Sequence, residues 1–314
     1  MSQIPHPKQP IELNAASVLG QDAGTVASPL VVKIGGALLE NAAQHLDAFA
    51  ALIALHRAHA GGIVLVHGGG AQVDQQLKLM GIETPRIEGI RVTTREAIDQ
   101  VVGVLAGSAH MHLLGILATQ GIRAVGLSLA DGGLCQCRHS TKYAFDAGEV
   151  GEIVSGDGTV VHTLLAAGFM PVINSIGLSN NGEPLNVNAD EAACAIARVT
   201  NAAGIVLLTD VAGVLDANQQ LIGELDAARV DALIAEGTIT GGMIPKVRSA
   251  LAAAADAGCP ATIASWRDVA ALGVGRAGTR FIASASLCSF VPSSHASSDR
   301  GSHCTAQRSQ HGTV

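Results

Sequence analysis

Short apolar segments rich in β-branched residues alternate with helical patterns along residues 30–283, and this alternation constrains the fold more than any other feature of the sequence. Fully apolar strands that alternate with helices are typical of a mainly parallel sheet that helices cover on both faces. The predicted strands are 30–34, 63–66, 124–127, 170–173, 205–208, 261–264 and 279–282, and the predicted helices include 41–59, 95–119, 190–199, 226–236 and 243–257.

The two ends of the chain lack this pattern. Residues 1–29 mix Pro, Gln, Ser and Asn, and residues 284–314 are rich in Ser, His and Arg. We therefore expect a disordered leader at 1–29 and a disordered tail at 284–314. The start has no apolar segment of a secretion signal, and the six cysteines are scattered, so we expect a cytoplasmic protein with reduced thiols.

Composition argues against two classes of partner. The net charge is −7 and aromatic residues make up 2% of the chain, whereas a nucleic-acid binder needs a basic face and stacking aromatics. No unbroken apolar run approaches the roughly 20 residues of a membrane helix. We therefore predict no nucleic-acid partner and no membrane span.

Glycine-rich turns follow the first two predicted strands. The first strand runs into Lys33-Ile34-Gly35-Gly36, and the second runs into His67-Gly68-Gly69-Gly70 followed by a helical pattern. Glycine lets backbone N–H groups approach an anion, and a helix N-terminus adds partial positive charge. The glycines alone could simply form tight turns, but two such turns, one with a lysine, favour a phosphate site. We interpret His67 itself as a structural residue.

Lysine is rare in this chain, which has 14 Arg and five Lys. Lys33 and Lys246 each lie beside a glycine pair, which suggests a need for a compact ammonium group. Asp190 directly precedes an Ala-rich helical segment, so it is either the cap of that helix or a carboxylate that holds both ammonium groups in position. We interpret Lys78 and Lys142 as surface charges.

Six motifs occur in the order and spacing of acetylglutamate kinases, and the chain resembles the short-chain, enterobacterial branch of that family over residues 30–283. The motifs are Lys33-Ile-Gly-Gly, His67-Gly-Gly-Gly, Gly89-Ile-Arg91-Val-Thr93, Asn186-Val-Asn-Ala-Asp190, Thr209-Asp210-Val-Ala-Gly213-Val-Leu215 and Gly241-Gly-Met-Ile-Pro-Lys246.

The resemblance implies the amino acid kinase fold, a three-layer αβα sandwich with a mainly parallel open sheet. It also implies transfer of the γ-phosphoryl group of ATP to the side-chain carboxylate of N-acetyl-L-glutamate, the second step of arginine biosynthesis. By likeness, residues 30–200 form the amino-acid-substrate and dimerisation lobe, and residues 201–283 form the nucleotide-binding lobe. Mg²⁺ is expected to arrive with ATP, held mainly by phosphates and water, with no protein ligand named.

The resemblance also implies roles for individual residues. Lys33 and Lys246 would be catalytic, with Asp190 orienting both. Arg91 would bind the α-carboxylate, Asn186 the acetamido group, and amides near Gly35, Gly36, Gly68 and Gly69 the phosphoryl oxygens and the substrate. The implied nucleotide-binding residues are Asp210, Val211, Ala212, Gly213, Val214, Leu215, Thr238, Ile239, Thr240, Gly241, Gly242, Met243 and Lys246.

Two expectations concern assembly and regulation. Arginine-inhibited hexameric members carry an extra helix before the first strand, and residues 1–29 show no amphipathic pattern, so we expect an arginine-insensitive homodimer. Segment 95–119 resembles the helix that forms the dimer, with His110 where Asn is common.

Other readings stay open at this point. A sister kinase acting on N-acetyl-aminoadipate, aspartate, carbamate or uridylate would share most of these motifs, because one methylene changes specificity by only about 1–3 kcal/mol. A non-catalytic sensor with the same fold is a further alternative.

Overall fold

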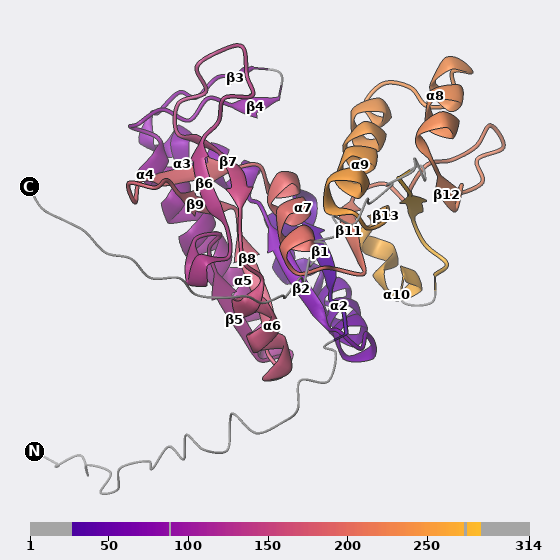
Figure 1. Ribbon diagram of the computed structural model, residues 1–314, viewed down its shortest axis with the longest axis horizontal. Coiled ribbons are helices and arrows are strands. Elements are labelled where there is room, and N and C mark those ends of the chain that lie inside the picture. The colour runs from indigo at the N-terminus through magenta and orange to yellow at the C-terminus, as the bar shows by residue number, and fades with distance from the viewer. Residues whose placement is uncertain (1–26, 88, 273–274, 284–314) are drawn as a thin grey trace, which may run out of the picture. The chain divides into compact units, whose positions relative to one another are not determined.

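One large sheet contains every strand that the sequence predicts (Figure 1). The computed structural model describes residues 27–87, 89–272 and 275–283, so the predicted tail and all of the predicted leader except 27–29 lie outside the described residues. The order of the sheet is β12-β14-β13-β11-β1-β2-β8-β5. Its strands are β1 (Leu30–Ile34), β2 (Ile63–His67), β5 (Ala124–Leu127), β8 (Met170–Asn174), β11 (Gly204–Thr209), β12 (Glu224–Leu225), β13 (Ala261–Ser265) and β14 (Thr279–Phe281).

The pairing is mainly parallel, as predicted. Every pair between neighbouring strands is parallel except β13 with β14, which is antiparallel. Because β1 pairs with β2 on one side and β11 on the other, the strands of the two predicted lobes form one continuous sheet. The carboxyl ends of its parallel strands therefore meet at one edge, where ligands bind in open α/β sheets.

Successive residues of the central strands pack into two separate cores. Val31 and Val64 belong to the cluster that contains Ile196 of α7 and Val247 of α9. Val32 belongs to the opposite cluster, which is built with α2 and α5. Since side chains alternate between the faces of a strand, this division shows helices packed on both faces.

The described helices include those that cover these two faces of the large sheet (Figure 1). They are α1 (Ala37–Glu40), α2 (Leu46–Ala58), α3 (Gly70–Met80), α4 (Ile98–Val102), α5 (Ala109–Thr119), α6 (Thr159–Ala166), α7 (Ala189–Val199), α8 (Ala227–Ala235), α9 (Met243–Ala257) and α10 (Val269–Leu272).

Two predicted helices are less regular than expected. The segment predicted as 41–59 begins with a short 3₁₀ turn, and α2 starts only at Leu46. The break lies at His45, which leaves helical geometry (φ −120°, ψ 40°) and packs its ring against that of Trp266, 4.3 Å between centroids. The segment predicted as 95–119 contains a π-helical stretch, Gly103–Ser108, between α4 and α5.

A second, four-stranded sheet and a short hairpin were missed by the sequence prediction. The sheet consists of β6 (Gln136–His139), β7 (Val150–Ser155), β10 (Pro184–Val187) and β9 (Ile176–Leu178), and the hairpin of β3 (Arg86–Ile87) and β4 (Ile90–Arg91). Polar residues interrupt β6, β7 and β10, and β3, β4 and β9 are at most three residues long, so no long apolar run marks these strands in the sequence.

The helical stretch Ile98–Thr119 is long and apolar enough to cross a bilayer by length and composition. Our criterion of an unbroken apolar run did not identify it, because polar residues such as Asp99 and Ser108 interrupt it. One of its faces is buried in the fold through Val101, Leu113 and Leu117. A core helix of a folded domain passes the same test, so length and composition are weak evidence for a membrane span.

Candidate active site

Lys33 and Asp190 form an ion pair at the carboxyl edge of the large sheet. Lys33 shares a face of β1 with Val31, which packs against α7. The Lys33 side chain therefore meets the first turn of α7, and its Nζ lies 2.9 Å from Oδ1 of Asp190. A Cβ on Gly35 would lie 3.4 Å from this Nζ, which is an ordinary van der Waals contact. The structure thus brings together two of the three predicted catalytic residues.

The first turn of α7 is capped by Asn188 rather than by Asp190. The Asn188 side chain accepts hydrogen bonds from the backbone N–H groups of Asp190 (2.8 Å) and Glu191 (3.3 Å). The alternative in which Asp190 itself is the helix cap is therefore wrong. Because Asn188 satisfies these donors, the Asp190 carboxylate is free to pair with Lys33.

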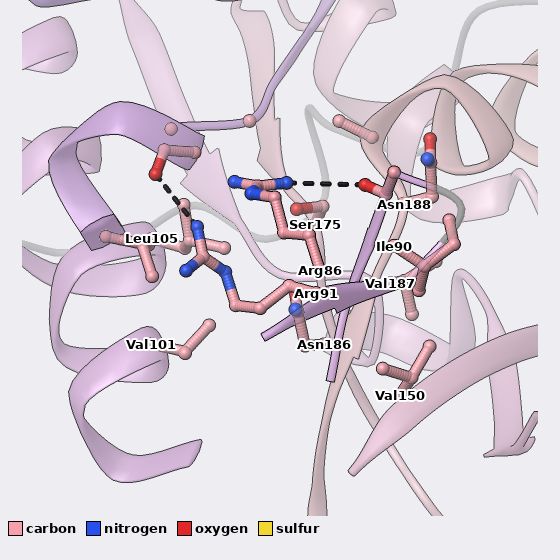
Figure 2. A pocket seen from close by; sticks show the side chains of 16 residues that line it. Arg86, Ile90, Arg91, Val101, Leu105, Val150, Ser175, Asn186, Val187 and Asn188 are labelled. Atoms are coloured by element: carbon pink, nitrogen blue, oxygen red, sulfur yellow. Dashed lines mark hydrogen bonds between the residues drawn. The ribbon is translucent and has the colours of Figure 1, made fainter. Parts of the chain in front are cut away.

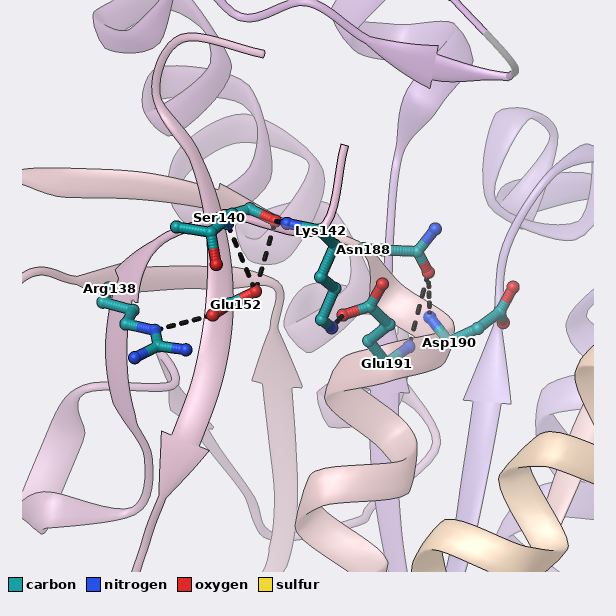
Figure 3. A network of polar contacts seen from close by, with 8 residues as sticks. Arg138, Ser140, Lys142, Glu152, Asn188, Asp190 and Glu191 are labelled. Atoms are coloured by element: carbon teal, nitrogen blue, oxygen red, sulfur yellow. Dashed lines mark hydrogen bonds and ion pairs between the residues drawn. The ribbon is translucent and has the colours of Figure 1, made fainter. Parts of the chain in front are cut away.

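A polar network holds this helix start from the other side (Figure 3). Lys142, which we interpreted as a surface charge, donates to Oε2 of Glu191 at 2.6 Å. Burial alone would lower the pKa of Lys142, but the hydrogen bond to Glu191 raises it. Glu152 anchors the loop that carries Lys142, because it accepts from the Thr141 backbone N–H at 3.4 Å, and it also accepts from Arg138 Nε at 2.6 Å. In Figure 3 the Asp190 carboxylate points away from this network.

A cavity of about 180 Å³ lies between hairpin β3–β4, the glycine turn after β2 and the start of α7 (Figure 2). All four residues predicted to bind the amino acid line it: Gly68, Gly69, Arg91 and Asn186. Asn188 and Ala189, the residues directly before Asp190, also line it. The apolar part of the wall comes from Val73, Val101, Leu105, Val150 and Val187.

Positive charge is concentrated at one wall of this cavity, on hairpin β3–β4. Arg91 is 7% exposed and pairs with Asp74 Oδ1, and it donates to Thr84 Oγ1 (3.1 Å) and the Gly70 carbonyl (3.0 Å). Arg86 pairs with the other oxygen of Asp74 at 3.0 Å. Two guanidinium groups thus share one carboxylate, and the excess positive charge favours an anionic ligand.

Arg86 and Asp74 were missed as site residues by the sequence prediction. Burial alone would raise the pKa of Asp74, but hydrogen bonds from Arg91 and Arg86 lower it. The available signal was the position of Arg86 close before the Gly89-Ile-Arg91 motif. Arg86 lines the same cavity as Arg91 because the two residues are paired across the antiparallel hairpin β3–β4. A motif read along the sequence does not show this pairing.

Asn186 lies on β10 in the small sheet. Its Nδ2 donates to Oγ1 of Thr93 at 3.0 Å, and this fixes the orientation of the amide. The amide oxygen is therefore available to accept a hydrogen bond from a ligand. Ser175, which follows β8, also lines the cavity and is 2% exposed as a residue.

A second, larger cavity of about 690 Å³ lies in the carboxyl-terminal part of the sheet. Most of the predicted nucleotide-binding residues line it. They are Val211, Ala212, Gly213, Val214, Leu215, Thr238, Ile239, Thr240 and Met243. The structure thus joins the loop after β11 and the segment before α9, which are distant in the sequence, around one space large enough for a small molecule.

Lys246 contacts a different carboxylate from the one we predicted. Its Nζ lies 3.1 Å from Oδ1 of Asp210, which follows β11, and this hydrogen bond lowers the pKa of Asp210. The prediction that Asp190 holds both ammonium groups is therefore wrong for this structure. Lys33 lies on β1 and pairs with Asp190, whereas Lys246 lies on α9 and pairs with Asp210.

The remaining predicted residues lie in turns beside these groups. Gly35 and Gly36 form the turn between β1 and α1, and Gly241 and Gly242 directly precede α9. Arg267, in the 3₁₀ turn that follows β13, donates from Nη1 to the Asp210 carbonyl at 3.5 Å.

Metal ligands are a separate question. Within residues 27–87, 89–272 and 275–283, no group of three or more His, Cys, Asp or Glu side chains is placed to hold a metal ion. A cation that enters with a nucleotide relies mainly on phosphate oxygens and water for its ligands.

Comparisons with known proteins agree with the predicted resemblance. A model of the amino acid kinase family matches residues 28–265. The acetylglutamate kinase of Vibrio cholerae is 46% identical over 259 residues, which cover 81% of this chain and 97% of that protein.

Solved structures share the architecture. N-acetylglutamate synthase from Neisseria gonorrhoeae is 23% identical with a TM-score of 0.67, covering 81% of this chain and 61% of that one. Carbamate kinase from Giardia lamblia is 18% identical with a TM-score of 0.57, covering 82% of this chain and 98% of that one. At such identities the likeness shows the fold alone, and it confirms the predicted αβα sandwich with a mainly parallel open sheet.

Proposed function

Since the chain belongs to the amino acid kinase family and, within it, to the acetylglutamate kinases, we propose that it transfers the γ-phosphoryl group of ATP to the side-chain carboxylate of N-acetyl-L-glutamate. The product is the acyl phosphate N-acetyl-L-glutamyl 5-phosphate, made at the second step of arginine biosynthesis. The observation that supports the proposal is that Gly68, Gly69, Arg91 and Asn186 line one cavity together with Ala189, the residue before Asp190, which pairs with Lys33.

Repulsion between negative charges is the main barrier to this reaction. The acceptor carboxylate is already ionised, so no general base is needed, and catalysis depends on positioning and electrostatic stabilisation. Asp190, the partner of Lys33, directly follows Ala189 of the smaller cavity, and Asp210, the partner of Lys246, directly precedes Val211 of the larger one. Lys33 would neutralise the transferring phosphoryl group from the side of the acceptor, and Lys246 from the side of the nucleotide. Asp190 orients Lys33.

Residues of the smaller cavity would bind and orient the acceptor. Arg91 has N–H groups beyond the three contacts it makes, and these would donate to the α-carboxylate. Asn186, held by Thr93, would accept from the acetamido N–H. The side-chain carboxylate would then extend toward Gly68 and Lys33.

The larger cavity would take the nucleotide. Residues 211–215 and 238–240 line it, and Gly241 and Gly242 would let the segment before α9 approach the phosphates. Mg²⁺ would come with ATP and neutralise phosphate charge, with its ligands mainly phosphate and water oxygens. In this assignment residues 30–200 form the amino-acid lobe and residues 201–283 the nucleotide lobe.

The proposed reaction predicts an acyl phosphate that hydroxylamine can trap. The protein is incubated with Mg-ATP, hydroxylamine and a panel of acids, and hydroxamate is measured colorimetrically. We expect strong product formation with N-acetyl-L-glutamate and little with aspartate or N-acetyl-aminoadipate. Product with another acid of the panel instead would identify a sister kinase, and no product with any acid would favour a non-catalytic sensor.

Replacing Arg91 with lysine is expected to raise the KM for N-acetyl-L-glutamate by about 10–100-fold, since a charged hydrogen bond contributes about 1.5–3 kcal/mol. Lysine keeps the charge that faces Asp74 but lacks the planar fork that binds a carboxylate through two donors. The KM for ATP should change little, which steady-state kinetics with each substrate varied would show.

Arg95→Lys is a suitable control for this variant. Arg95 is exposed and pairs with Glu149 and Glu183 outside the lining of the cavity. Equal changes in the two KM values for Arg91→Lys, or no change in either, would contradict the assignment of Arg91 to the acceptor.

We further propose a cytoplasmic homodimer that L-arginine does not inhibit. The stretch α4–α5 resembles the helix that forms the family's dimer, and Met111 on its outer side is 62% exposed. A large exposed apolar side chain beside small residues such as Gly115 suits a helix contact. We expect twice the chain mass in sedimentation equilibrium and unchanged activity with added L-arginine. A monomer, or a steep loss of activity, would contradict the respective part.

A further inference from the structure

Two histidines that the proposed reaction does not use lie buried side by side beneath the glycine turn after β2. His67 ends β2 and is 0% exposed, and His110 on α5 is 5% exposed. Nε2 of His67 lies 2.7 Å from Nδ1 of His110, and Nδ1 of His67 lies 2.8 Å from the Gly68 carbonyl oxygen. A chain of hydrogen bonds thus joins α5 to the backbone of this turn.

The direction of each hydrogen bond follows from the acceptor at its end. A carbonyl oxygen can only accept, so Nδ1 of His67 must carry the proton that it donates to Gly68. In a neutral ring Nε2 of His67 is then an acceptor, and Nδ1–H of His110 must donate to it. With both rings neutral, the two contacts allow only one tautomer for each ring.

The electrostatics of the pair agree with this scheme. Burial lowers the pKa of His67 to about 4 and also lowers the pKa of His110. Asp131 is the charged group that acts in the opposite direction on His110. Both rings are thus neutral near pH 7.

The surrounding residues are shaped to hold His110 in this position. A Cβ on Gly126 of β5 would lie 2.2 Å from Nε2 of His110, so only glycine at this position leaves space for the ring. The turn itself, Gly68–Gly70, carries no side chains of its own, and glycine gives it unusual conformational freedom. The Gly68 N–H has only a long contact of 3.4 Å with the Ile34 carbonyl.

We propose that His110 is a positioning residue, which acts through His67 to hold the Gly68 carbonyl and so orients the turn that lines the acceptor cavity. This inference rests on the proposed function of that cavity. His110 does not touch the substrate, and its effect is transmitted by the two hydrogen bonds.

Two variants separate the hydrogen bond from the bulk of the ring. His110→Leu keeps an apolar side chain of similar size but removes the donor, whereas His110→Asn places an amide N–H at the position of Nδ1. We expect the Leu variant to weaken binding of N-acetyl-L-glutamate by roughly 10-fold or more, since small misplacements of binding groups have such effects. The Asn variant should recover most of the affinity, and ATP binding should stay within about twofold in both.

A matched control removes the effect of general destabilisation. Leu113→Ala alters the same helix at a buried residue that packs against the sheet rather than against His67. It should lower thermal stability but leave the affinity for N-acetyl-L-glutamate unchanged. Affinities are measured by titration calorimetry, which needs no turnover.

Imidazole ¹⁵N spectra of the wild-type protein give a readout independent of any ligand. We expect His67 as the Nδ1–H tautomer, assigned by the loss of its signals in His67→Gln. The proposal is overturned if His67 is the Nε2–H tautomer, if His110→Leu binds the acceptor as tightly as wild type, or if His110→Asn restores nothing. Absence of acyl phosphate in the wild-type protein would refute the proposed function, whereas the tautomer measurement would still decide the histidine contact.

Discussion

Replacing Lys33 with alanine is expected to lower kcat for acyl phosphate formation by about 10²–10³-fold, as does the loss of a preorganised electrostatic donor in other enzymes. The Lys33 ammonium is fixed by Asp190 at 2.9 Å, so it is in place before the reaction and costs little reorganisation. The variant leaves a carboxylate without its cation beside the acceptor, which adds repulsion where negative charge already limits the rate. Hydroxamate formation at saturating substrates measures the effect.

Lys78→Ala is the matched control for this experiment. Lys78 lies on the exposed side of α3, and its substitution removes the same charge from the protein without touching the site. We expect wild-type turnover in Lys78→Ala. The role of Lys33 is refuted if Lys33→Ala keeps turnover within a few-fold of the control, provided that both variants melt at the same temperature as the wild-type protein.

The strand prediction failed in a systematic way at the edge where the site lies. Four of the predicted strands stop at residues 66, 173, 208 and 264, whereas the observed strands continue by one residue, to His67, Asn174, Thr209 and Ser265; β1 ends at Ile34 as predicted. All four are polar, and three of them are buried. A prediction based on apolar runs ends each strand at its first polar residue. In a parallel sheet, polar residues at the carboxyl ends of the strands lie where ligands bind.

The small sheet and hairpin β3–β4 escaped prediction for a different reason. The sequence of β6, Gln-Cys-Arg-His, has a single buried side chain, Cys137, and β3 and β4 are two residues long each. Such strands are stabilised by packing against the neighbouring strands, and the hydrophobic pattern of their own sequence does not mark them. Since this region carries Arg86 and Asn186, the walls of the acceptor cavity were known only as separate motifs.

Motif order identified most residues that line the two cavities, but it did not identify their ion-pair partners. Asp74 lies on α3 and follows the glycine turn, yet only the fold brings it to Arg91. Likewise, Asn188 rather than Asp190 caps α7, because the helix begins at Ala189, which frees the carboxylate. Such pairings depend on where helices begin and how they pack, which local sequence determines poorly.

The pairing of Lys246 with Asp210 bears on how the two substrates would meet. Lys246 is held at 3.1 Å by Asp210, which follows β11, whereas Lys33 is held by Asp190. A bound phosphate would compete with Asp210 for the ammonium group, because both are anions and the lysine is 37% exposed and able to move. Lys246 is therefore a group that the nucleotide would recruit, while Lys33 is already in place.

Lys246→Ala is expected to reduce kcat by about 10²–10³-fold, because one of the two cations that neutralise the transferring group is lost. Asp210→Asn, which removes the competing charge but keeps a polar side chain, should have a much smaller effect on kcat and should change mainly the KM for ATP. Steady-state kinetics of both variants with ATP varied distinguish these outcomes. Arg248→Ala is the control, since Arg248 lies on the same helix and pairs with Asp231 at 2.6 Å. Near-normal kcat in Lys246→Ala, or a loss in Arg248→Ala of the same size, would show that Lys246 does not act on the transferring phosphoryl group.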